Sequence, residues 1–357
     1  MNVFDRYATH IFPLFPVTYG RLTSLLPFSL GEWMLVAALL LIVLFFLSLV
    51  AVLFLRLRNG KRFVLPKALR IFYHFLLCVF CIFFVIMMLN CFILYRCTPM
   101  IRQLEKEYEE ASGEASDDSA LASGEVLAKL RDTCVTRCNE LAAALPRDDN
   151  GDLIIAEREV ITASAQQAMT DAAAYFPRLK GFQVRPKPLF FSDFVSQQSM
   201  TGYYFPFSME ANYNNVMNRI HLPFTMCHEL AHTHGYLRED ECNYLAWFAC
   251  ITSDDLVFQY SGWLNVLYYL EHDFKRDVGA EMYALHPAIS DTVRRDAAFL
   301  SEETKARIEE NALFKREDVK KAAEVYVDTT LKANGIKEGY DNYAEVVKLM
   351  LLTVLPP

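Results

Sequence analysis

The sequence predicts a mainly α-helical protein with a small β-sheet, of the α+β class, attached to a membrane by two helices near its N-terminus. Two long runs, 33–55 and 71–95, contain no Asp, Glu, Lys or Arg and predict the membrane helices. Residues 182–221 place aromatic and β-branched residues among Pro and Gly, which predicts short strands and loops. Most of the remaining chain repeats apolar residues at helical spacing, which predicts helices around that sheet.

The segment before the first apolar run, residues 1–32, is apolar, aromatic and interrupted by prolines. Phe15 and Phe28 are neighbours of Pro16 and Pro27, and this spacing argues against one long helix. Such a composition suits a segment that lies at the membrane interface or packs beneath the outer part of the protein. An unstructured tail is the alternative.

The two apolar runs predict two membrane spans within residues 33–96, because each is long enough to cross a hydrocarbon core of roughly 30 Å. The connection between them holds six basic residues and no acidic one: Arg56, Arg58, Lys61, Arg62, Lys67 and Arg70. The positive-inside rule assigns this loop to the cytoplasm and everything after residue 96 to the outside. We therefore expect a multi-pass protein of the plasma membrane, whose basic loop meets anionic head groups of the lipid bilayer.

Beyond the spans, residues 97–125 are acidic and rich in Ser, Ala and Gly, which predicts a charged spacer, partly disordered or a frayed helix. Residues 126–357 predict one outer domain. Helices are expected near 126–145, 157–174, 243–270, 302–331 and 343–355. The region 202–206 or 216–222 is the candidate for an exposed edge strand to which a peptide could add.

One motif dominates the outer domain: the five residues from His228 to His232 read HELAH, an HExxH pattern. Positions four apart share one face of a helix, so both imidazoles can point at a single zinc ion. Glu229 follows the first histidine and can act as a general base on a water beside the metal. The sequence therefore predicts a Zn²⁺ site with its own base.

A third ligand is expected seven residues after His232, at Glu239. Gly235 can end the first helix in a left-handed conformation, and a second helix can begin near Arg238. Asn243 lies on the same stripe as Glu239 and can orient a ligand imidazole. Glu241 is the alternative ligand, since a helix cannot direct residues two apart to the same side. We expect His234 to point away from the pair and to be solvated.

The HELAH motif resembles that of the gluzincin metallopeptidases, and this resemblance implies a further Tyr or His that stabilises the oxyanion, which is left open among Tyr283, His286, Tyr268 and His272. In the expected reaction, Glu229 accepts a proton from water and returns it to the leaving amine. The partner is then a peptide or protein substrate. The chain carries net charge −8 and has no basic stripe or phosphate-binding glycine loop, so we expect no nucleic-acid partner.

The stretch HELAH, a glycine and then REDECNYLAWFAC resembles the metal-site signature of a family of two-pass bacterial membrane proteins of unassigned function, grouped with the gluzincin metallopeptidases. The resemblance also covers residues 27–33, 261–270 and 326–351. It implies a membrane-anchored zinc peptidase fold in which Glu239 takes the glutamate position of an ExxxD motif. Asn243 stands where that motif has its aspartate.

Two other functions fit the same sequence. The peptidase fold could serve as a zinc-binding or metal-free receptor of a membrane sensor, or as an assembly protein of the cell envelope. Both predict that Glu229→Gln leaves function intact. A peptidase instead loses cleavage in that variant while it retains zinc. The complete HExxH motif favours the peptidase.

Overall fold

The computed structural model describes residues 2–60, 63–112, 124–312, 315–333 and 345–354. Within these ranges the protein is mostly helical, with one small three-stranded sheet, as the sequence predicts. Part of the predicted spacer, residues 113–123, lies outside the described residues, and so do the two basic residues at 61 and 62.

The segment before the first apolar run forms short helices, so the alternative of an unstructured tail is wrong. It contains α1 (Val3–His10), a π-helical turn η1 (Pro16–Gly20) and α2 (Arg21–Thr23). Asn2 caps α1 through a reciprocal pair of hydrogen bonds with Asp5, at 2.8 and 3.0 Å. The Tyr7 hydroxyl then donates to the carbonyl of Leu89, near the end of the second apolar run.

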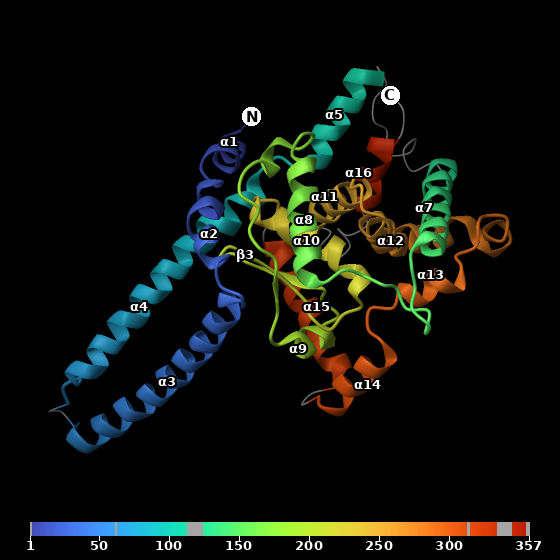
Figure 1. Ribbon diagram of the computed structural model, residues 1–357. Coiled ribbons are helices and arrows are strands. Elements are labelled where there is room, and N and C mark those ends of the chain that lie inside the picture. The colour runs from blue at the N-terminus through green and yellow to red at the C-terminus, as the bar shows by residue number, and fades with distance from the viewer. Residues whose placement is uncertain (1, 61–62, 113–123, 313–314, 334–344, 355–357) are drawn as a thin grey trace.

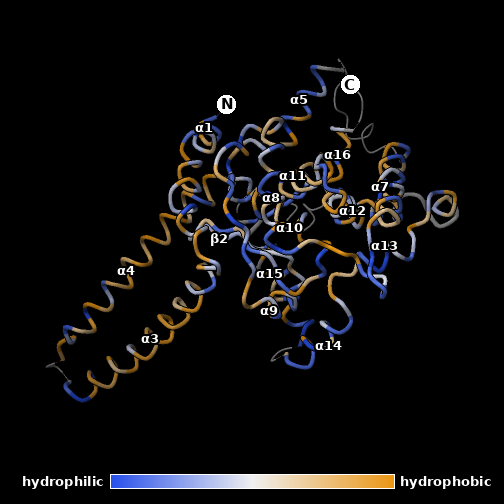
Figure 2. The backbone as a smooth tube through the Cα atoms, in the orientation of Figure 1, coloured by the Kyte–Doolittle hydropathy of each residue, from blue (hydrophilic) through white to orange (hydrophobic). Residues whose placement is uncertain are grey.

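The two apolar runs form a helical hairpin that extends away from the rest of the protein (Figure 1). It consists of α3 (Leu30–Asn59) and α4 (Lys67–Met87), and the chain continues through the turns η3 (Met88–Phe92) and η4 (Leu94–Arg96). Figure 2 shows the hydrophobic residues concentrated along both helices. Both are long and apolar enough to cross a membrane, and only 6% of each apolar window is buried, unlike a core helix of a soluble protein.

The main core lies in the helical domain. Buried residues such as Trp247, Tyr260 and Phe258 fill it, and Met100 and Leu104 extend it to the residues after the second apolar run. The spacer expected from residue 97 is therefore helical and packed in its first part. The helices here are α5 (Met100–Ser112), α7 (Gly124–Ala144), α8 (Arg158–Ala172), η5 (Pro177–Leu179), α10 (Leu222–Thr233), α11 (Glu239–Ile251), α12 (Leu256–Tyr283), α13 (Asp291–Asp296), α14 (Glu302–Glu310), α15 (Arg316–Ala333) and α16 (Glu345–Val354).

The sheet has the strand order β1 (Lys187–Pro188), β3 (Glu210–Tyr213), β2 (Gly202–Phe205), and the short helix α9 (Ser192–Gln197) lies between the first two strands in sequence. β1 pairs with β3 in parallel, and β2 pairs with β3 antiparallel, with Tyr203 opposite Asn212. Within the described strands β2 is thus an edge, as predicted for 202–206. The alternative edge at 216–222 is wrong: it contains the 3-10 turn η6 (Arg219–His221), followed by the start of α10.

Other elements differ from the predicted boundaries in modest ways. The single helix expected over 302–331 is two helices, α14 and α15. The polar residues after Glu310 include Asn311, whose backbone conformation lies outside the regular helix region. The helix expected at 343–355 is described only over Glu345–Val354.

A second, smaller hydrophobic cluster joins the N-terminal segment and the end of the second apolar run to the domain. Its buried members are Ala8, Phe12, Leu94, Cys97, Met209 and Leu237. Leu237 belongs to the short link between α10 and α11, and Tyr204 of β2 packs against the same cluster. The N-terminal segment, the turns that follow α4 and the link between α10 and α11 therefore share a core.

Candidate metal site

Helix α10 carries the HExxH motif through the interior of the domain. Pro223 occupies the first turn, where the missing amide hydrogen is no loss and the fixed φ suits a helix start. Helix α10 packs against α8, α11 and the sheet, and eleven of its twelve residues are buried. It ends at Thr233, and the φ of 84° at Gly235, two residues later, confirms the predicted left-handed turn. Helix α11 then begins at Glu239, as expected.

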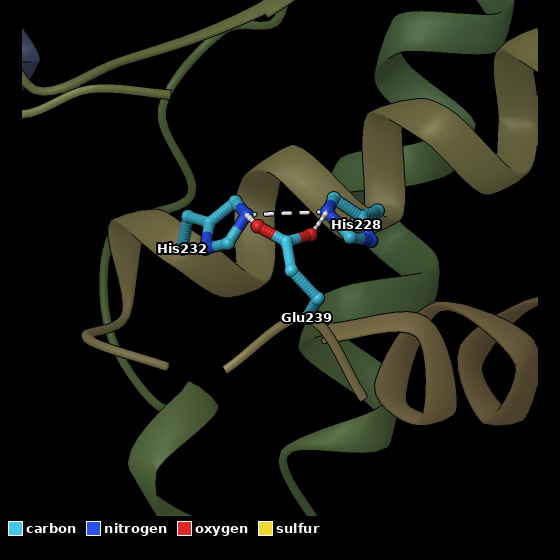
Figure 3. A group of neighbouring side chains, drawn as sticks. All are labelled: His228, His232 and Glu239. Carbon is cyan, nitrogen blue, oxygen red and sulfur yellow. Dashed lines mark hydrogen bonds and ion pairs between the residues drawn. The ribbon is translucent and has the colours of Figure 1, made fainter. Parts of the chain in front are cut away.

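His228, His232 and Glu239 point toward one another across this turn (Figure 3). The two Nε2 atoms are 3.1 Å apart. The Glu239 carboxylate lies 3.2 Å from Nε2 of His228 and 3.9 Å from Nε2 of His232. The three potential ligand atoms all lie within 4.8 Å of one another. Two ligands of a tetrahedral zinc ion, each 2.0–2.1 Å from it, are separated by about 3.3 Å, so this donor set fits zinc.

The opposite ring nitrogens determine which tautomer each histidine adopts. Nδ1 of His228 lies 2.9 Å from Oδ1 of Asn243, and Nδ1 of His232 lies 2.8 Å from the carbonyl of Tyr236. Both oxygens can only accept, so each Nδ1 carries a proton and donates it. Each Nε2 can then offer a lone pair, which is the state that a metal ligand needs.

The charges of the three side chains follow from burial and from their mutual contacts. Burial disfavours a charged His228, yet contact with Glu239 raises the pKa of that imidazole above 6.5. Burial likewise opposes ionisation of Glu239, but the hydrogen bond and positive charge of His228 hold its pKa below the ordinary value. Burial lowers the pKa of His232 to about 4, so that imidazole is neutral. A metal ion would replace the proton shared by His228 and Glu239.

Glu229 lies beside the group and does not belong to it. The residue is 4% exposed, and Oε2 of its carboxylate is a buried oxygen without a hydrogen-bond partner among the described residues. Burial raises the pKa of Glu229 to about 8, and Glu239 acts in the same direction while His228 opposes it. An uncompensated buried carboxylate of this kind is costly in a merely structural position.

Strand β2 runs alongside the motif. A Cβ on Gly202 would lie 2.5 Å from Oε1 of Glu229, so only glycine leaves room for the carboxylate. Two residues later the ring of Tyr204 stacks on His232, with centroids 5.7 Å apart. Because alternate residues of a strand share one face, Gly202 and Tyr204 together present that face to α10.

The other acidic residues of the α11 start lie elsewhere. Glu241 accepts a hydrogen bond from the backbone of Met100 at 2.7 Å, and it is not part of the group formed by the two histidines and Glu239. His234, expected in solvent, is instead 4% exposed. Its Nε2 is 2.9 Å from Gln183 and its Nδ1 is 3.1 Å from the carbonyl of Arg178. That expectation is wrong because η5 and the loop after it cover the turn.

Within the described part of the chain, the candidate oxyanion donors make their contacts away from His228, His232 and Glu239. The Tyr283 hydroxyl donates to Glu271 at 2.8 Å, and Nδ1 of His286 pairs with Asp132 at 2.8 Å. Tyr268 is 72% exposed and stacks on His272. These contacts commit Tyr283 and His286 to a cluster around Arg131 that joins α7 to α12.

Tyr269 was missed by sequence reasoning and lies next to the site. Its hydroxyl is 3.5 Å from Nδ2 of Asn243, behind the His228 imidazole. Tyr268 and Tyr269 are adjacent in sequence, and only the positions of buried neighbours such as Val266 and Leu270 could have indicated which tyrosine faces inward.

Comparison with known proteins gives one match, to a protein family. No curated protein and no solved structure matches this chain. The family model is described as "Protein of unknown function (DUF3810)" and matches residues 7–351. That span includes both long apolar helices, the sheet and the three side chains at the centre of the candidate site. The chain therefore belongs to the DUF3810 family.

Proposed function

We propose that this protein is a membrane-anchored, zinc-dependent metallopeptidase of the gluzincin type. The observation that carries the proposal is the convergence of two imidazole Nε2 atoms and one carboxylate within 4.8 Å, with the buried carboxylate of Glu229 beside them. Two histidines one helical turn apart and an acid from the next helix match the ligand chemistry of catalytic zinc sites, which keep a position open for water.

His228, His232 and Glu239 would hold the ion. Zinc bound there supplies Lewis acidity, which acidifies a water molecule and polarises a substrate carbonyl. Asn243 and the carbonyl of Tyr236 hold the two rings in the tautomer and orientation that this role requires. Asn243 is neutral where related sites have an aspartate, so it orients His228 without adding negative charge.

Glu229 is the proposed general base. Its raised pKa, about 8 in the absence of a cation, would fall toward neutrality beside a bound ion, because a nearby positive charge favours the carboxylate. A base near neutrality can accept a proton from water and return it to the leaving amine. The buried Oε2, which has no described partner, leaves an oxygen free for that proton.

The edge strand β2 supports a peptide as the substrate. It pairs with β3 on one side, and its residues lie over the HExxH helix at Gly202 and Tyr204. An extended peptide that adds to a sheet edge gains main-chain hydrogen bonds independently of its sequence. Addition along β2 would bring a peptide bond next to Glu229.

The two apolar helices and the basic residues between them support a plasma-membrane location with the domain outside the cytoplasm. Arg56 and Arg58 occupy the last turn of α3, at the end of the hairpin farthest from the domain (Figure 1). The positive-inside rule then assigns the opposite end, where α3 begins at Leu30, to the extracytoplasmic side.

The decisive experiment compares the full-length chain with Glu229→Gln in detergent. We expect the unmodified chain to bind one zinc ion and to cleave members of a peptide library in a chelator-sensitive reaction. Glu229→Gln should retain zinc, because it is not a ligand, and lose cleavage by at least ~100-fold. A zinc-bound chain that cleaves no peptide would refute the peptidase and favour the receptor or assembly role.

A further inference from the structure

The strand beside the candidate metal site also contacts the first apolar helix. Gly202 and Tyr204 face α10, while Phe205 turns to the opposite face of the strand. A Cβ on Gly31, in the first turn of α3, would overlap the ring of Phe205. Four residues of β2 thus connect the HExxH motif to the start of the helix.

Two buried carboxylates fix this junction. Glu210 of β3 accepts hydrogen bonds from the amides of Leu30 at 3.1 Å and Gly31 at 2.8 Å, at the α3 N-terminus. Glu32 of α3 accepts from the amides of Phe190 and Phe191, each at 2.9 Å. One carboxylate comes from the sheet and binds amides of the helix, and the other comes from the helix and binds amides near the sheet. Together they hold the sheet and the helix in one orientation.

The turn between β2 and β3 packs against the second apolar helix, α4. The ring of Phe207 in that turn packs on Phe83 of α4, with centroids 4.5 Å apart. In the antiparallel hairpin of α3 and α4, the hydroxyl of Ser48 lies 2.9 Å from the hydroxyl of Tyr73. Because α3 and α4 run in opposite directions, ten residues after Tyr73 on α4 correspond to ten residues before Ser48 on α3. Phe83 therefore lies at the same level as Ala38.

Ala38 is five residues inside the apolar run that starts at Trp33, about 7.5 Å along a helix. Two exposed aromatic side chains lie near the start of this apolar run: Trp33 is 57% exposed, and Phe190, whose backbone amide donates to Glu32, is 81% exposed. Aromatic residues of this kind occupy the membrane interface. With α3 and α4 spanning a bilayer as proposed, the sheet would lie at the bilayer surface and its β2–β3 turn would dip below it.

We propose that the substrate is an extended segment of a polypeptide that is itself held in the same bilayer, cut within a few residues of the membrane. Tyr204, which stacks on His232, is three residues from Phe207, or about 10 Å in an extended chain. A substrate strand beside β2 would leave the bilayer next to the turn and reach Glu229 about three to six residues later. This inference rests on the proposed peptidase activity.

The cleavage test uses the full-length chain in lipid vesicles with one peptide sequence presented in three ways. One substrate carries the sequence four residues from a transmembrane helix, one carries it after a flexible spacer of thirty residues, and one is the soluble peptide. We expect the short-spaced substrate to be cleaved at least tenfold faster than the soluble peptide and no slower than the long-spaced one. The two anchored substrates have equal surface concentration, so spacing alone separates them.

The location of the sheet can be measured without any enzymatic activity. Phe190→Trp in a Trp33→Phe background places an indole at the proposed interface, and Arg137→Trp, an exposed position on the distant helix α7, is the matched control (Figure 1). Vesicles of brominated lipid should quench the fluorescence of the first variant more than that of the second.

The two readouts separate the possible failures. Equal quenching of the two tryptophans, or cleavage of the long-spaced and soluble substrates with the short-spaced one untouched, overturns the inference while the peptidase stands. Absence of cleavage of all three by the zinc-bound chain overturns both the inference and the proposed function. Cleavage that persists in Glu229→Gln has the same consequence, since the site then does not cause it.

Discussion

The ring of Tyr204 stacks on the imidazole of His232, with centroids 5.7 Å apart and planes inclined by 22°. This contact sets the distance between an edge strand and a candidate zinc ligand. Two residues earlier Gly202 lies against the Glu229 carboxylate, so the strand has one register along α10. The positions of base, ligand and strand edge are therefore coupled, and each can be tested separately.

The register requires glycine at position 202. In Gly202→Ala the added Cβ would lie 2.5 Å from Oε1 of Glu229 and 2.6 Å from the carbonyl oxygen of Asn212. The Glu229 side chain can move more easily than the backbone of Asn212. Glu229 should move, and a misplaced base should lower the rate of peptide cleavage by about 100-fold with zinc content unchanged.

Gly262→Ala is the matched control, since its Cβ would lie 2.8 Å from Cβ of Cys250 in the core. It should lower stability without changing the rate per folded chain. Rate and zinc content are measured on both variants. Full activity in Gly202→Ala would show that Glu229 does not need its present position.

The two acidic residues at the start of α11 should differ in metal binding. Glu239→Gln removes the only described carboxylate near both Nε2 atoms, so zinc affinity should fall by about 100-fold or more. Glu241→Gln keeps an oxygen for the Met100 amide and should bind zinc as the unmodified chain does. Competition with a chelator measures both affinities. The reverse order of the two affinities would make Glu241 the ligand.

Local patterns in the sequence could predict the parts of the site that depend on neighbouring residues. Helical spacing predicts that His228 and His232 share a face, and Gly235 predicts the turn that returns the chain at Glu239. Adjacent residues with similar chemistry are harder to separate. Helical spacing from buried neighbours such as Val266 could indicate that Tyr269 rather than Tyr268 faces inward, but Asn243, the residue that Tyr269 meets there, lies on another helix and has no local signal.

Contacts between segments that are far apart in the chain could not be predicted from local sequence patterns. Glu210 binds the amides of Leu30 and Gly31 across about 180 residues of sequence, and such a carboxylate reads as an ordinary polar residue of a short strand. The burial of His234 was equally unpredictable, because its partner Gln183 lies in a loop some fifty residues earlier in the sequence. The small sheet was predictable as a region, while its attachment to the first apolar helix, α3, required the folded structure.

The junction between the sheet and the apolar helix α3 should depend on a buried ion pair. Lys187 and Glu210 are in contact, and both side chains are 1% exposed. Glu210→Gln leaves the Lys187 charge without its counter-ion, and the expected loss of stability is about 3 kcal/mol. Lys187→Met combined with Glu210→Gln should recover part of it, because the unpaired charge is gone.

Thermal unfolding in detergent measures the effect of these substitutions. The control is Lys320→Met, which removes an exposed ion pair with Glu324 and should leave the unfolding temperature nearly unchanged. Equal unfolding temperatures for Glu210→Gln and the unmodified chain would mean that the pair does not stabilise the junction.

Protonation of a buried histidine outside the metal site should make stability depend on pH. His221 in η6 is 7% exposed, and its Nδ1 lies 2.9 Å from Oδ1 of Asn265. Burial lowers the pKa of this imidazole below 6.5, although contacts with Asn265 and Ala298 and the charge of Asp296 act in the opposite direction. The unfolded chain keeps the ordinary pKa, so below about 6.5 it binds a proton that the folded chain does not.

Stability should therefore be complete above pH 6.5 and fall as the pH is lowered, by up to about 1.4 kcal/mol per pH unit from this residue. His221→Gln keeps a side-chain amide that can donate to Asn265 and removes the proton uptake. Unfolding at pH 7.5 and 5.5 is compared for the two chains in chelator, so that zinc release does not contribute. The unmodified chain should lose more stability than His221→Gln over this interval, since all other titrating groups are common to both. Parallel losses would mean that His221 takes up its proton equally in the folded and unfolded chains.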